Sequence, residues 1–257
     1  METWNEPHGP HEGKQAREDC PLPATHDKIE EVHYFLHRLL DEIHHPAEFR
    51  WNLNGFLQGC RSVLYLSRTE LKDLPDFEVW WQKANAALHR SPTVKKVIDS
   101  RNFIVHERML DQWSEVQTGV FRDRRLKIGF GGNPPNDWYS ENLLRFVAHV
   151  WTGVYLDKRH SSFGEQFGVR RSWRIPELGE GDVAERCVEA HSLLSEFVLA
   201  AHHFAGTDML PLAEPEWLHD RGSYDVLLET DLDPTLVKKW RWDEAAKIYQ
   251  EWLSLRK

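Results

Sequence analysis

The sequence predicts a mostly α-helical protein, and three observations support this fold class. Apolar residues recur every three or four positions along most of the chain, which is the spacing of a helix with one buried face. Serine, aspartate and proline stand where several of these segments begin, as is usual at helix N-termini. The 257 residues include 40% hydrophobic residues and 12 tryptophans, which is enough for a substantial core.

Composition narrows the class of protein. The net charge of -9 argues against a protein that coats nucleic acid indiscriminately. Cys20, Cys60 and Cys187 are far apart and show neither metal-ligand spacing nor a disulfide framework, so we expect a cytoplasmic protein without a metal or other cofactor. The N-terminus has no signal-peptide pattern, and no apolar run reaches the roughly 18 residues needed to span a bilayer, so we expect no membrane partner.

The first half of the chain predicts a helical bundle. Residues 1–24 are rich in proline, glycine, histidine and charge, and we expect them to form a mobile extension. Residues 25–115 predict four amphipathic helices joined by short breaks, which favours an antiparallel four-helix bundle. We expect these helices at Asp27–Ile43, Phe49–Leu64, Phe77–Leu88 and Ser91–Met109.

Residues 116–257 carry no functional motif, and their role stays open. Alternating apolar residues around a charged turn predict a small β-hairpin, after which helical spacing returns. We expect a hairpin at Val116–Phe130, a loop at Gly129–Asp137, a helix at Leu143–Val154, irregular chain at Lys158–Glu180, a helix from Asp182 to Ala201 and a last helix from Asp233.

The stretch Ser100–Glu107, at the end of the fourth predicted helix, is the candidate functional site. Arg101 lies on the apolar stripe of that helix, and because an unpaired buried charge is costly, it needs a partner or a cleft. His106 follows five residues later. From Arg90 to Lys127 the chain is locally basic, with nine basic and five acidic residues. The apolar stripe consists of Val94, Val97, Ile98, Ile104 and Val105.

An arginine paired with a histidine suits the metal-independent cleavage of RNA. Histidine has a pKa near neutrality and can move the proton of the ribose 2′-hydroxyl. Arginine can hold the scissile phosphate with a bidentate fork and stabilise its extra negative charge. On an ideal helix Arg101 and His106 diverge by about 140°, whereas Asn102 lies one turn from His106 and can orient it. Two copies facing each other across a two-fold axis could close such a site.

The sequence Arg101-Asn102-Phe103-Ile104-Val105-His106 combines this spacing with a polar residue directly after the arginine. The motif lies at the end of the fourth helix. In this position, and together with the sequence Phe49–Gln58 of the second helix, residues 27–115 resemble the HEPN superfamily of RNases. The resemblance implies a metal-independent endoribonuclease, acting as a toxin or phage-defence effector. It also implies a homodimer with a composite active site, RNA as the substrate and a cognate antitoxin as a possible partner.

Arg108 departs from one pattern of this family. Family toxins regulated by a nucleotidyltransferase antitoxin often carry a tyrosine two residues after the histidine, so that mode of regulation is in doubt here. We assign Arg108 to RNA binding. Arg50, Asn54 and Arg61 form a polar row on the second helix, which either lines an RNA groove or makes the polar contacts of the dimer.

Two alternatives compete with an active site. In the first, Arg101 pairs with an acid such as Asp99 or Glu107, and His106 caps the helix end, so the cluster is structural. In the second, the bundle is a catalytically silent HEPN-like module that binds RNA or protein, since a fold does not determine activity.

The other histidines predict no metal site. His33 and His37 lie one turn apart, as metal ligands can, but the sequence shows no third ligand for them. We expect this pair to lie on a solvent-exposed helix face. We expect the same of two pairs of consecutive histidines, His44-His45 and His202-His203.

Overall fold

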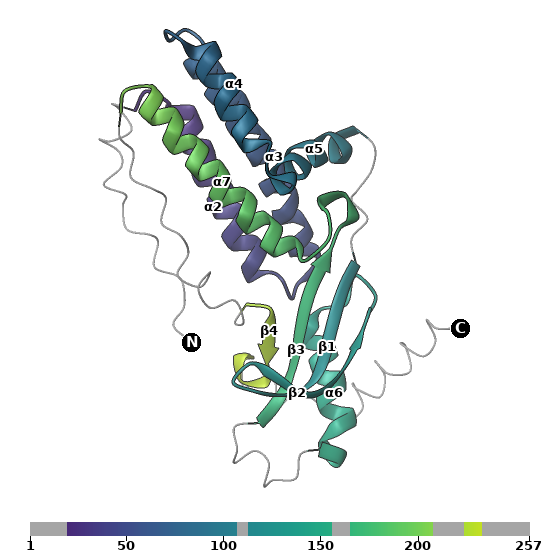
Figure 1. Cartoon of the computed structure of the whole chain (residues 1–257). Coiled ribbons are helices and arrows are strands. Elements are labelled where there is room, and N and C mark those ends of the chain that lie inside the picture. The colour runs from purple at the N-terminus through teal and green to yellow at the C-terminus, as the bar shows by residue number, and fades with distance from the viewer. Residues whose placement is uncertain (1–19, 107–112, 156–164, 208–223, 233–257) are drawn as a thin grey trace. The chain divides into compact units, whose positions relative to one another are not determined.

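The computed structural model describes residues 20–106, 113–155, 165–207 and 224–232, and it describes their side chains except at 100–106 and 148–155. Two compact units can be distinguished, and each is treated by itself. The helical unit comprises Met1–Leu40, Arg50–Asp111 and Ile175–Pro215, and the sheet unit comprises Asp41–Phe49, Gln112–Arg174 and Glu216–Lys257. Six α-helices and one antiparallel sheet among the described residues confirm the mostly α fold class (Figure 1).

The helical unit contains most of α2 and α3 and all of α4, α5 and α7. All four helices expected between residues 25 and 115 are present, although the first begins at Pro23 rather than Asp27. The bounds are α2 (Pro23–Asp41), α3 (Pro46–Leu71), α4 (Phe77–Leu88), α5 (Pro92–His106) and α7 (Val183–Phe204), with a short 3-10 helix, η2, at Pro176–Leu178.

Two helix starts follow from local sequence. The Ser91 hydroxyl accepts a hydrogen bond from the Val94 amide at 3.3 Å, and Pro92 is the first residue of α5. The Asp182 carboxylate accepts one from the Ala184 amide at 2.8 Å and caps α7. Both starts are therefore where the sequence predicts them.

Two glycines allow α3 to approach α2 closely. A Cβ at Gly55 would lie 2.6 Å from the Phe35 ring, and a Cβ at Gly59 would lie 2.7 Å from Val32 Cγ2. Such distances are far below van der Waals contact, so any larger residue would push the two helices apart.

Helix α7 belongs to the helical unit although it comes from the second half of the chain. It contacts α4 and α5, and Figure 1 shows α4 and α7 running with a similar tilt while α5 is steeply inclined to both. Aromatic rings join α4 to α7, with Trp80 stacked on Phe204 at a centroid distance of 4.8 Å. The expected four helices are thus accompanied by a fifth.

The sheet unit is built on four antiparallel strands in the order β2-β1-β3-β4. The predicted hairpin is confirmed: β1 pairs with β2, and the turn between them places Asp123 and Arg124 at positive φ (49° and 57°), as a two-residue hairpin turn requires. The elements are β1 (Trp113–Arg122), β2 (Arg125–Gly132), α6 (Ser140–Tyr155), β3 (Glu165–Arg174), β4 (Val226–Leu228) and the 3-10 helix η4 (Glu229–Asp231).

Two expectations for this section are wrong. Lys158–Glu180 was expected to be irregular, but β3 occupies part of it, with Phe167, Val169, Arg171 and Trp173 buried in alternation. An arginine at one of the inward positions interrupts the apolar alternation that would have predicted a strand. The loop expected from Gly129 begins later, because β2 continues to Gly132 by pairing its backbone with β1.

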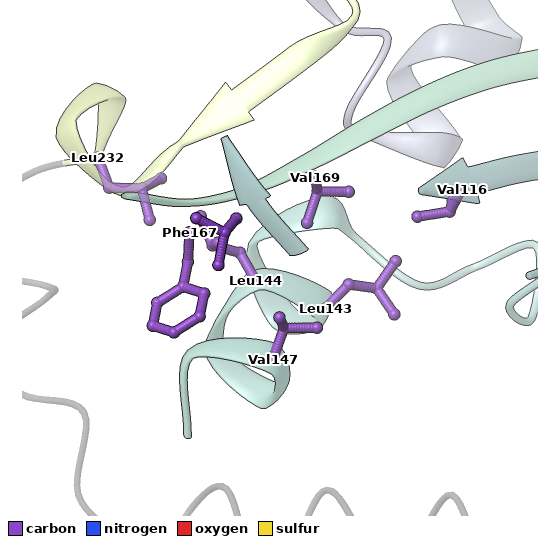
Figure 2. Close-up of a cluster of buried hydrophobic side chains, with 8 residues drawn as sticks. Val116, Leu143, Leu144, Val147, Phe167, Val169 and Leu232 are labelled. Atoms are coloured by element: carbon purple, nitrogen blue, oxygen red, sulfur yellow. The ribbon is translucent and has the colours of Figure 1, made fainter. Parts of the chain in front are cut away.

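Helix α6 is present where the spacing at Leu143–Val154 predicts a helix, and it covers one face of the sheet. Figure 2 shows the resulting core, in which side chains of α6 meet side chains of β1 and β3 together with Leu232. The buried members are Val116, Val120, Leu143, Leu144, Val147, Phe167, Val169 and Leu232.

The expected mobile extension over residues 1–24 is wrong at its end, because Leu22 is 0% exposed and α2 begins at Pro23. Residues 1–19 of that extension and the last helix expected from Asp233 fall outside the described residues. Of the helices that the structure describes, none combines the length and the apolar character that crossing a bilayer demands.

Candidate functional site

Helix α5 carries the predicted catalytic residues on one continuous backbone. It runs from Pro92 to His106, so Arg101, Asn102 and His106 occupy its last two turns. Five residues of helix separate the arginine and histidine positions by about 7.5 Å along the axis and about 140° around it. The side chains of these three residues lie outside the described ones, as does all of Arg108.

The N-terminal half of α5 has a well-defined buried face. Thr93, Val94, Val97 and Ile98 are each less than 9% exposed. Position 101 comes four residues after Val97 and three after Ile98, so it is next in the same row of the helix.

The start of α5 is tied to α7 by a polar cluster. Glu189 accepts hydrogen bonds from the hydroxyls of Ser91 (3.1 Å) and Thr93 (2.9 Å). Arg186 donates to Thr93 Oγ1 at 3.0 Å and, through two nitrogens, to the Glu180 carbonyl. The first turn of α5 is therefore held in place, which orients the rest of the helix.

The predicted polar row on α3 is half-buried rather than fully exposed. Arg50, Asn54 and Arg61 each have intermediate exposure. Two aromatic side chains on the same helix are much more exposed, Trp51 at 61% and Tyr65 at 71%. The prediction that the tryptophans are core residues is wrong for Trp51. Exposed aromatic rings beside arginines are the combination on which single-stranded bases stack.

The expectation of solvated histidine flanks is wrong at several positions. His202 is 2% exposed and His44 is 8% exposed. His33 and His37 are half-buried, with 2.9 Å between their Nε2 atoms, and His33 Nδ1 lies 3.2 Å from Nε2 of His191 on α7. Burial and the neighbouring histidines lower the pKa of His191 to about 3. The missing third histidine of this group is 158 positions away from His33, so no local pattern could show it.

A second group brings Cys20, His26 and His202 together at the start of α2 and the end of α7. Cys20 Sγ lies 3.3 Å from His202 Nε2 and 3.8 Å from His26 Nδ1, and the three atoms lie within 4.8 Å of one another. The spacing of the cysteines predicts no metal ligands among them. His202, a neighbour of Cys20 in the fold, lies 182 positions away in the sequence, so local spacing could not show this group. Within the described residues, this is the group whose atoms could hold a metal ion.

Comparison with known proteins identifies a family. Residues 13–221 match the family model described as bacteriophage lambda protein ea47. This span covers about four fifths of the 257 residues, and the chain belongs to that family. Neither the curated proteins nor the solved structures gave a significant match.

Proposed function

We propose that this member of the bacteriophage lambda ea47 family is a metal-independent endoribonuclease of HEPN type, with its active site on α5. His106 acts as general acid and base, Arg101 stabilises the scissile phosphate and Asn102 orients the histidine. The observation that carries the proposal is that α5 is one continuous helix to His106 and that position 101 follows the buried Val97 and Ile98 at helical spacing. Because an unpaired buried charge is costly, an arginine at this position is expected to face a cleft or a partner.

The geometry favours a composite site. Because the arginine and histidine positions diverge by about 140° on one helix, two copies related by a two-fold axis would complete the site by facing their α5 helices toward each other. In this proposal α2 to α5 form the HEPN-like bundle, and α7 is an additional helix that anchors the start of α5.

The exposed face of α3 supports RNA as the substrate. Trp51 and Tyr65 offer rings for base stacking, and Arg50, Asn54 and Arg61 lie beside them on the same helix. Arg108 adds a further basic residue two positions after the catalytic histidine. The protein would act in the cytoplasm as a toxin or phage-defence effector, with room for a cognate antitoxin.

The reaction follows from the residue types. The ribose 2′-oxygen attacks phosphorus as its proton passes to His106. The bond between phosphorus and the 5′-oxygen breaks, and the 5′-oxygen takes a proton from the imidazolium of His106. The products carry a 2′,3′-cyclic phosphate and a 5′-hydroxyl. A substrate with a 2′-O-methyl group at every position therefore resists cleavage, which distinguishes this route from hydrolysis by a metal-activated water.

The test is cleavage of a mixed-sequence single-stranded RNA by the purified chain in excess chelator. We expect Arg101→Ala and His106→Ala each to reduce the rate by about 100-fold or more. Arg90→Ala and His203→Ala are matched controls on exposed positions of the same unit and should retain the wild-type rate. Circular dichroism at the assay temperature verifies that each protein is folded in chelator. Intact RNA at high enzyme concentration, or full activity in both α5 variants, overturns the proposal.

A catalytically silent RNA-binding module is the second candidate, and the aromatic face of α3 favours it independently of α5. In that case the chain binds single-stranded RNA without cutting it, and Trp51→Ala weakens binding by about 5-fold to 150-fold, the contribution of one stacked base. Fluorescence anisotropy with a 2′-O-methyl RNA measures binding without cleavage. Unchanged affinity in Trp51→Ala would remove this candidate.

A further inference from the structure

We propose that Cys20, His26 and His202 form a binding site for one zinc ion that ties the start of α2 to the end of α7. The site is separate from the proposed RNase residues on α5 and does not depend on them. It joins residues 182 positions apart in the sequence.

The ligand atoms have the spacing of a tetrahedral zinc site. Zinc bonds of about 2.3 Å to sulfur and about 2.0 Å to nitrogen place sulfur and nitrogen about 3.5 Å apart at a tetrahedral angle. The observed distances from Cys20 Sγ are 3.3 Å to His202 Nε2 and 3.8 Å to His26 Nδ1. All three atoms lie within 4.8 Å of one another, so adjustment of the side chains lets them contact one ion.

The remote nitrogens of both histidines are held in the way that metal-binding histidines usually are. His202 Nδ1 lies 2.9 Å from the Val198 carbonyl, which can only accept, so Nδ1 carries the proton and Nε2 presents its lone pair to Cys20. His26 Nε2 lies 3.1 Å from the Glu30 carboxylate, which leaves the lone pair on Nδ1. A carbonyl and a carboxylate behind the ligating imidazoles are the usual supports of zinc-bound histidines.

Packing brings the three side chains together before any ion binds. Leu22, two residues after Cys20, and Ala201, directly before His202, belong to the same buried cluster with Leu71 and Phe77. Cys20 itself packs against this cluster. A site that is already assembled loses little conformational entropy when it binds its ion.

The electrostatic surroundings favour a cation. Glu70 accepts hydrogen bonds from the amides of Ala24 and Thr25 at 2.8 and 3.0 Å, and its charge acts on His202. When zinc binds, the Cys20 thiol releases one proton to solvent and the thiolate becomes the third ligand. Water completes the tetrahedron.

Cobalt(II) titration of the full chain, after treatment with chelator, tests the site directly. Cobalt bound by a thiolate gives a sulfur-to-metal charge-transfer band, and we expect one equivalent to saturate this band. Cys20→Ser removes the band, and His26→Ala weakens it. Cys60→Ala and His37→Ala are the matched controls, a cysteine and a half-buried histidine of the same unit, and both retain it.

The hydrogen bond between His26 and Glu30 gives a second test of the zinc site. Glu30→Gln keeps all three ligands and is expected to weaken zinc affinity by about 10-fold to 100-fold, measured by competition with a chromophoric chelator. Absence of the band in the wild type, or an equal band in Cys20→Ser, overturns the proposal. Loss of the band in His37→Ala with full retention in His26→Ala also overturns it, because the ion would then belong to the group of His33, His37 and His191.

Discussion

The two units each bury a histidine, and they use it differently. In the sheet unit both ring nitrogens of His44 have protein partners, the Ser140 hydroxyl at 3.0 Å and the Tyr224 carbonyl at 3.1 Å. In the helical unit Nδ1 of His202 donates a hydrogen bond to a backbone carbonyl, while Nε2 faces the thiol of Cys20. Burial therefore does not mark a functional histidine. The partner of the second ring nitrogen distinguishes the two side chains.

Arg171 in the sheet unit is, like His44, a buried polar residue with a structural role. Its side chain is 0% exposed and donates to the carbonyls of His44 and Trp138, and its guanidinium lies 5.3 Å from the centroid of the Trp173 ring. Burial lowers the pKa of Arg171 to about 10, so the group is still charged at neutral pH. Among the described residues its side chain contacts two backbone carbonyls and a ring, which together hold the segment around His44 to the sheet.

The largest expected effect tests this structural role. Arg171→Ala leaves two carbonyls without their donor and opens a cavity, so we expect the free energy of unfolding to fall by about 3–5 kcal/mol. Chemical denaturation followed by circular dichroism measures the loss. Arg174→Ala on the same strand is the control, because its ion pair with Glu115 is partly exposed and should contribute less than about 1 kcal/mol. Equal effects of the two substitutions would contradict the distinction.

The next effect concerns the helical unit. If zinc binds the folded chain at Cys20, His26 and His202, free zinc at about 100 times its dissociation constant stabilises the protein by about 2.7 kcal/mol. We expect thermal unfolding to shift upward with zinc in the wild type and to stay constant in Cys20→Ser. A shift of the same size in both proteins would place the ion elsewhere.

The smallest expected effect is the contribution of His44 to the pH dependence of the free energy of unfolding. Burial, together with the charge of Arg171, lowers the pKa of His44 from 6.5 to about 3, so between these values the unfolded chain binds a proton that the folded chain does not. The stability contributed by this group is full above pH 6.5 and falls as the pH decreases toward 3, with a loss of about 2 kcal/mol between pH 7 and pH 5.

The control for this pH effect is a variant without the titrating group. His44→Gln should be less sensitive than the wild type by about 1.4 kcal/mol per pH unit between pH 6 and pH 4, measured by denaturant unfolding at each pH. His191 titrates in the same direction in both proteins and cancels in the comparison. Identical slopes would show that His44 is accessible to protons in the folded state.

Part of the fold could be predicted from the sequence because it depends on local rules. Helices α2 to α7 follow from apolar spacing, the starts of α5 and α7 follow from Ser91-Pro92 and Asp182, and the β1–β2 hairpin follows from alternation around a charged turn. Strand β3 was missed because Arg171 occupies an inward position, and the favourable surroundings of that arginine come from other segments of the chain.

The candidate sites divide in the same way. The spacing of Arg101, Asn102 and His106 on one helix is a property of consecutive residues, so the sequence by itself determined it. The grouping of Cys20 with His26 and His202 was decided by tertiary structure, because α7 and the segment before α2 share a buried cluster. Hydrophobic burial is non-directional and chooses partners by shape over the whole chain, and its outcome cannot be read from the residues next to Cys20.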